Sequence, residues 1–158
     1  MACELLRREF SDSAGNEFLF TTRQLSASKA LDLQVELINK LGNTVFPFID
    51  NRYNFTDIVN FMAYADNKVV TELVKRVVCM SNKEGVEITN ALFDTHFNGE
   101  LMMLCKVFAF VLEANFQSFF KQGLEMNVQF KSAEEARLKA EELKLQKAAL
   151  TSPENSPT

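Results

Sequence analysis

Hydrophobic and polar positions follow two different patterns along the chain. In the first 25 residues, the turn-forming stretch Ser11–Asn16 (SDSAGN) precedes the β-favouring residues Phe18–Thr22. This order predicts a β-hairpin over residues 1–25. From residue 26 onward, apolar residues recur mainly every three or four positions, which predicts helices.

The first predicted helix has the clearest amphipathic pattern in the chain. Ser26 or Ser28 can cap its N-terminus, and Gly42 marks its end. Its apolar positions repeat at a spacing of three and four residues and are Leu31, Val35, Ile38 and Leu41. The spacing predicts an amphipathic helix with these residues as its apolar face.

Shorter helices are predicted in the middle of the chain, after the break at Pro47. Their starting points are Asn54 or Thr56, Asp66 or Asn67, and Thr89 or Asn90. Because residues 69–80 are rich in β-branched side chains, a strand is an alternative there, although the period of the apolar residues favours a helix. Ser81–Gly85 (SNKEG) is predicted to be a polar connector, and the pair Asn98 and Gly99 a turn.

The most apolar helix is predicted over about residues 100–122, with Gly123 as its end. It is apolar on almost every side between Leu101 and Leu112, interrupted by Lys106. A helix of this kind in a soluble protein belongs at the centre of a bundle.

A charged helix is predicted near the C-terminus, where the composition changes after Phe130. Ser132 and Glu135 form an expected capping box, and Ala, Glu, Lys and Leu dominate the residues that follow. Because its apolar stripe is thin, we expect this helix to project from the body or to lie lightly on it, as a solvated spacer. The alternative is an arm that tethers a second protein or mediates self-association.

These patterns predict a mainly α protein: a small helical bundle around a central apolar helix, with an N-terminal β-hairpin and a projecting C-terminal helix. The expected parts are the hairpin (1–25), a helical body (26–124), a linker with the charged helix (125–150) and a disordered tail (151–158) that holds two prolines. The chain has 158 residues, of which 47% are hydrophobic and 24% charged, as in a compact soluble domain.

Charge and cysteine content argue against several classes of function. The formal net charge is −4, and no stretch concentrates Lys and Arg without compensating acidic residues, which disfavours nucleic-acid binding. The longest apolar stretch is shorter than the about 20 residues of a membrane span, so we expect no membrane partner. Cys3, Cys79 and Cys105 form no C-x-x-C pair and are expected to be reduced thiols. A single histidine excludes multi-histidine metal sites, and no cofactor is expected.

One short segment, FDTHFNGE, gathers Asp94, His96 and Glu100. Asp94 and His96 are two positions apart, so they point to different sides of a helix. We interpret the segment as a polar turn whose side chains cap helix ends. The chain is therefore not expected to be an enzyme.

Phenylalanine is unusually frequent, with fifteen residues. Phe116, Phe119 and Phe120 lie together at the end of the central helix, where core packing and a partner groove are both open interpretations. Met102 and Met103 carry the same two interpretations, because flexible thioethers suit an irregular core or a permissive surface. These five residues are the candidate partner-binding residues.

Two blocks of the sequence share a pattern of positions with a known family. The first block is residues 23–43 (RQLSASKALDLQVELINKLGN), where the matching positions are Ala30, Leu31, Leu41 and Gly42. The second block is residues 93–120 (FDTHFNGELMMLCKVFAFVLEANFQSFF), where they are Phe93, Phe97, Gly99, Leu101, Val111, Leu112, Asn115, Phe116, Phe119 and Phe120. On these positions the chain resembles the tail assembly chaperones of long-tailed bacteriophages, over about residues 20–122.

The resemblance implies a non-catalytic chaperone that acts in the host bacterial cytoplasm and is absent from the mature virion. Its partner would be the tape measure protein, a long helical chain kept soluble while tail tube subunits assemble around it. In many relatives, a longer frameshifted form recruits the tube protein. The alternative function is a non-catalytic helical adaptor or regulatory protein, which could be a dimer.

Overall fold

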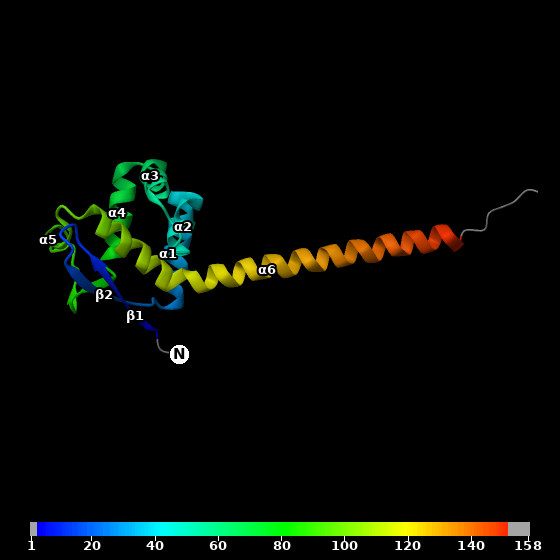
Figure 1. The fold of residues 1–158 in the computed structure, drawn as a ribbon, viewed down its shortest axis with the longest axis horizontal. Helices are drawn as coiled ribbons and strands as arrows, with labels where there is room; N and C mark the ends of the chain where they lie inside the picture. The colour runs from blue at the N-terminus through cyan, green and yellow to red at the C-terminus, as the bar shows by residue number, and fades with distance from the viewer. Residues whose placement is uncertain (1–2, 152–158) are drawn as a thin grey trace, which may run out of the picture. The chain divides into compact units, whose positions relative to one another are not determined.

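The computed structural model describes residues 3–151 (Figure 1). Apart from residue 151, the tail predicted to be disordered (151–158) lies outside the described residues. The elements in chain order are β1 (Leu5–Ser11), β2 (Glu17–Arg23), α1 (Ala27–Leu41), the 3-10 helix η1 (Gly42–Val45), α2 (Phe46–Ile49), α3 (Phe55–Tyr64), α4 (Asn67–Val78), β3 (Ser81–Lys83), β4 (Val86–Glu87), α5 (Phe93–Phe97) and α6 (Leu101–Thr151). The protein is mainly α and begins with an antiparallel hairpin, so the predicted fold class is confirmed. It divides into two compact units, residues 1–120 and 121–158.

The four strands form one antiparallel sheet in the order β1-β2-β3-β4. The predicted N-terminal hairpin is present, with Leu5 opposite Arg23 at its open end. The prediction of a plain polar connector over Ser81–Gly85 was wrong, because β3 pairs with the second edge of β2 and then turns into β4. Glu84 and Gly85 both have positive φ at this turn. Tertiary pairing supplies the hydrogen bonds that the weak strand propensity of this stretch does not predict.

Two of the predicted helix starts are present with their capping hydrogen bonds. The Asn54 side chain accepts from the backbone of Asp57, whose carboxylate accepts from the Asn54 backbone, and α3 begins there. Asp66 caps α4, which is helical throughout and so excludes the strand alternative. The helix predicted from Thr89 or Asn90 begins later, at Phe93.

Helix α1 buries a different face from the predicted one. Three of the four residues of the predicted stripe are exposed: Leu31 (66%), Val35 (49%) and Ile38 (41%). The face that packs into the core carries Leu33, Gln34, Leu37 and Leu41. Both sets recur at helical spacing, so the periodicity of α1 alone does not distinguish them.

The first half of α6 is the centre of the 1–120 unit, as predicted. Its residues 107–112 are all buried, and Phe108 contacts the rings of Phe48 and Phe61. By length and composition, α6 contains a window apolar enough to cross a membrane, but 44% of that window is buried inside the protein. The core helix of a soluble protein has the same character.

The predicted helix end at Gly123 was wrong, and so was the linker expected before Ser132. Helix α6 continues through both positions to Thr151. A glycine inside a helix costs only about 1 kcal/mol relative to alanine, and strong helix formers on both sides offset this cost. Ser132 is therefore an interior residue rather than a cap. In the 121–158 unit, the large apolar side chains from Leu124 to Leu150 are exposed.

Candidate functional site

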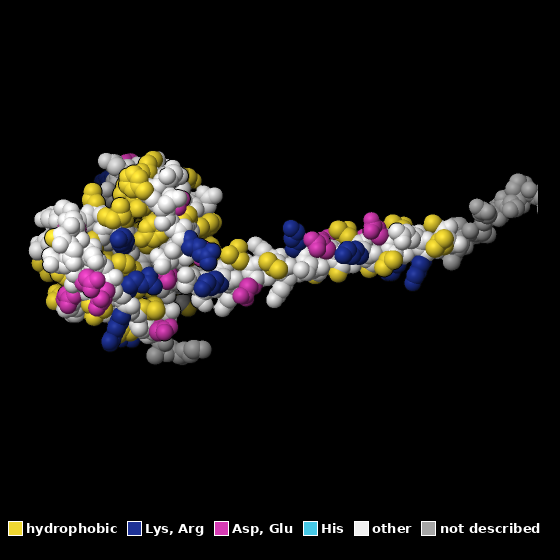
Figure 2. Space-filling model, in the orientation of Figure 1, with side chains coloured by type: hydrophobic (Ala, Val, Ile, Leu, Met, Phe, Trp, Pro, Cys, Tyr) yellow, Lys and Arg dark blue, Asp and Glu magenta, His cyan; other side chains and the backbone are white. Residues whose placement is uncertain are grey.

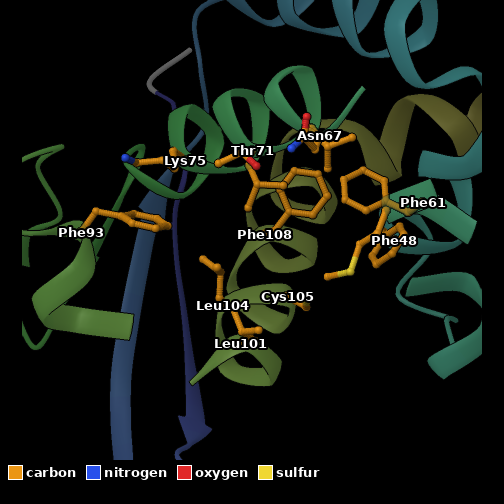
Figure 3. A pocket seen from close by; sticks show the side chains of 13 residues that line it. Phe48, Phe61, Asn67, Thr71, Lys75, Phe93, Leu101, Leu104, Cys105 and Phe108 are labelled. Atoms are coloured by element: carbon orange, nitrogen blue, oxygen red, sulfur yellow. The ribbon is translucent and has the colours of Figure 1, made fainter. Parts of the chain in front are cut away.

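An apolar groove of about 340 Å³ opens on the 1–120 unit, between α2, α3, α4, α5 and the first turns of α6 (Figure 3). Its lining comes from five helices and consists of Phe48, Phe61, Met62, Asn67, Val70, Thr71, Val74, Lys75, Phe93, Leu101, Leu104, Cys105 and Phe108. Most of these side chains are hydrocarbon, so the groove is suited to bind an apolar surface.

The floor of the groove is a fixed cluster of aromatic rings. Phe48 and Phe61 have ring centroids 5.2 Å apart, and Phe61 and Phe108 5.1 Å apart. All three side chains are buried. Cys105 is also buried, and this burial raises the pKa of its thiol, which therefore stays neutral at physiological pH. Because these groups pack against the core, the floor is formed before any partner binds.

The rim of the groove is exposed and apolar. Met62 is 45% exposed and Leu101 68% exposed. On α3, Met62 continues a stripe with Phe55 and Val59, both exposed, at the i, i+4, i+7 spacing of one helical face. In Figure 2, hydrophobic side chains gather on the surface where Figure 1 places α3. Exposed apolar surface adjoining a pocket is typical of a protein-binding site.

The amide, hydroxyl and ammonium groups among the described lining residues come from α4. Asn67, Thr71 and Lys75 follow one another at a spacing of four residues. Lys75 lies at the end of the groove beside Phe93, with its Nζ atom 5.2 Å from the ring centroid (Figure 3). Among the described residues that line the groove, Lys75 is the one charged side chain.

A comparison with protein families matches residues 16–127 to a family model described as phage tail assembly chaperone protein, TAC. The chain belongs to this family. No curated protein and no solved structure matches it. The match confirms the family resemblance and covers every residue that lines the groove of this tail assembly chaperone. The family is non-enzymatic in general.

The five candidate partner-binding residues of the chaperone divide between core and surface, and none lines the groove. Met103 (2% exposed) and Phe116 (3%) are core residues. Met102 (47%) and Phe119 (63%) are exposed. Phe120 is half-buried, with its ring centroid 4.9 Å from that of Phe46. The structure therefore places Met102 and Phe119 where a partner can reach them.

Sequence reasoning missed the groove itself. On α6, its wall is Leu101, Leu104, Cys105 and Phe108, which recur at i, i+3, i+4 and i+7. That stripe is present in the sequence, but the residues between its members are also apolar, so periodicity does not distinguish it. The other walls are brought to α6 by tertiary packing.

The side chains of Asp94, His96 and Glu100 do not come together to form a site. The Glu100 carboxylate accepts hydrogen bonds from Ser13, from its backbone N–H at 2.9 Å and its hydroxyl at 2.6 Å. Thus Glu100 holds the β1–β2 turn rather than a helix end. His96 Nε2 is buried and has no hydrogen-bond partner within residues 3–151. Across that same range, no group of three or more His, Cys, Asp or Glu residues could hold a metal ion.

Proposed function

We propose that this tail assembly chaperone binds the tape measure protein in the host bacterial cytoplasm, keeps it soluble and helps to recruit tail tube subunits. The chaperone would be absent from the mature virion. The observation that carries the proposal is the open apolar groove on a preformed aromatic floor.

The physical reason for the proposal is that a long helical client has an apolar stripe, which must be covered until assembly. Exposed apolar stripes aggregate in water, because burying them against one another is favourable. A groove lined by apolar side chains can bind such a stripe in a helix-in-groove mode. Recognition of this kind requires neither a cofactor nor catalysis.

Co-expression tests the proposal directly. The tape measure protein encoded by the same phage is produced with and without the chaperone, and its soluble fraction is compared. We expect the soluble fraction to rise and the two proteins to co-elute. An unchanged soluble fraction with a well-folded chaperone would overturn the proposal and favour a helical adaptor.

A matched pair of variants localises the activity. Leu101→Asp places a charge at the groove rim, whereas Leu124→Asp makes the same change in the 121–158 unit, at a leucine of similar exposure (68% and 63%). We expect Leu101→Asp to lower the soluble fraction of the client and Leu124→Asp to leave it unchanged. Co-elution of the client with the tail tube protein, with and without the chaperone, tests recruitment separately.

A further inference from the structure

We propose that the groove selects the client helix by charge as well as by hydrophobicity: it takes an amphipathic α-helix with an acidic side chain positioned to pair with Lys75. This inference rests on the proposed function and deepens it by naming the chemistry of the bound segment.

The length of the groove suits about two turns of a helix. Its α4 wall runs from Asn67 to Lys75, and its α6 wall from Leu101 to Phe108. At 1.5 Å per residue, these walls are roughly 10–12 Å long. The two walls cross in Figure 3, so a client helix would follow one of them and place apolar side chains at positions i, i+3 or i+4, and i+7 in the groove.

The apolar surface continues beyond the groove on α3. Met62 belongs both to the groove lining and to the exposed stripe with Phe55 and Val59. This continuity provides a place for further apolar residues of the same client helix. It also explains why three large apolar side chains on one face of α3 remain exposed.

Lys75 is available to pair with a client carboxylate. Within residues 3–151, no carboxylate lies within ion-pair distance of its ammonium group, which instead faces the Phe93 ring. Its neighbour Arg76 is already paired with Glu36 on α1. A carboxylate brought to the Lys75 end of the groove would gain an ion pair in a partly desolvated place, whereas a cation there would be repelled.

The test uses two synthetic 18-residue amphipathic helical peptides with the same leucine stripe. They differ at one position beside the stripe, which carries Glu in one peptide and Lys in the other. We expect the full-length protein to bind the Glu peptide about three- to ten-fold more tightly at low ionic strength. Lys75→Glu should reverse the preference, whereas Lys139→Glu, which changes the net charge equally outside the groove lining, should preserve it.

Methionine methyl NMR shows where the peptides bind. The Met62 methyl lies in the groove, whereas Met126 lies in the 121–158 unit and is 67% exposed. We expect the Met62 resonance to shift on peptide binding and the Met126 resonance to stay in place. Shifts at Met126 without shifts at Met62 would overturn the assignment of the groove.

The outcomes separate this inference from the proposed function. If both peptides shift Met62 but bind equally, charge selection by Lys75 is wrong and the groove is still the binding site. If neither peptide binds although the co-expressed client is soluble, the chaperone function holds and the inference fails. Failure of the co-expression experiment itself would overturn the proposed function.

Discussion

Arg8 on β1 and Glu113 on α6 form a two-pronged ion pair that joins the N-terminal hairpin to the central helix. Arg8 Nη1 donates to Glu113 Oε2 at 2.6 Å, and Nη2 donates to Oε1 at 3.0 Å. The guanidinium also lies over Phe110, 5.1 Å from its ring centroid. Paired hydrogen bonds of this geometry fix both distance and orientation. The pair therefore sets how the hairpin lies on α6.

Removing the charge of Glu113 should destabilise the 1–120 unit. We expect Glu113→Gln to lower the free energy of unfolding by about 1–2 kcal/mol, because this part-buried pair loses a charge-assisted hydrogen bond. Urea denaturation measures this change. The control is Asp50→Asn, which removes the exposed pair with Arg52 and should cost less than about 0.5 kcal/mol. Equal losses in both variants would contradict the assigned role of the Arg8 pair.

Phe116 and Phe119, three residues apart on α6, should respond in opposite ways to truncation. Phe116 is 3% exposed and Phe119 63% exposed. We expect Phe116→Ala to cost about 3–5 kcal/mol of stability, as other large-to-small core substitutions do. Phe119→Ala should cost less than about 1 kcal/mol, mainly through its edge-to-face contact with Phe120.

Thermal melts of the two variants check this prediction, and client solubility completes it. If Phe119→Ala melts like the wild type but keeps less client soluble, Phe119 is a partner contact. A large thermal destabilisation by Phe119→Ala would instead show that the side chain packs in the folded protein.

Local chemistry explains which parts of the fold the sequence could predict. The caps at Asn54 and Asp66 act within three residues of themselves, so the starts of α3 and α4 can be found without tertiary information. The central position of α6 follows from its apolar composition on all sides. These features need no knowledge of which elements become neighbours.

Features that depend on long-range contacts were not predictable in this way. Helix α1 carries two apolar stripes, and only packing decides that Leu37 is buried while Leu31 is exposed. Strand β3 exists because the edge of β2 is open to it. The groove requires Phe48, Val74 and Leu104 from three separate helices to meet. Neither periodicity nor spacing along the chain contains that information.

Two glycines should differ in the sign of their response to alanine. Gly42 has φ +58° and ψ −144°, a conformation that strains other residues, and an added Cβ would lie 2.6 Å from Tyr64 Oη. We expect Gly42→Ala to cost about 1–3 kcal/mol. Gly123 is helical with nothing within 4 Å of an added Cβ, so Gly123→Ala should stabilise the local helix by about 1 kcal/mol.

Urea denaturation measures the first change, and amide hydrogen exchange around residue 123 measures the second. Faster exchange in Gly123→Ala would show that this glycine has a role other than a tolerated helix interior. An unchanged free energy of unfolding in Gly42→Ala would show that the α1–η1 junction adopts a different backbone conformation.

The stability of the folded protein should depend on pH through His96. Burial, and secondarily the positive charge of Lys83, lower the pKa of His96 below its ordinary value of 6.5. In the range between the lowered pKa and 6.5, the unfolded chain binds more protons than the folded one, so the free energy of unfolding falls as the pH falls. Above 6.5, the histidine is neutral in both states and this contribution to stability is fully present. Urea denaturation between pH 5 and 8 measures the free energy of unfolding of the wild type and of His96→Gln. The difference between these two free energies should change below pH 6.5 and stay constant above it. A difference that is constant over the whole range would show that His96 titrates alike in the folded and unfolded states.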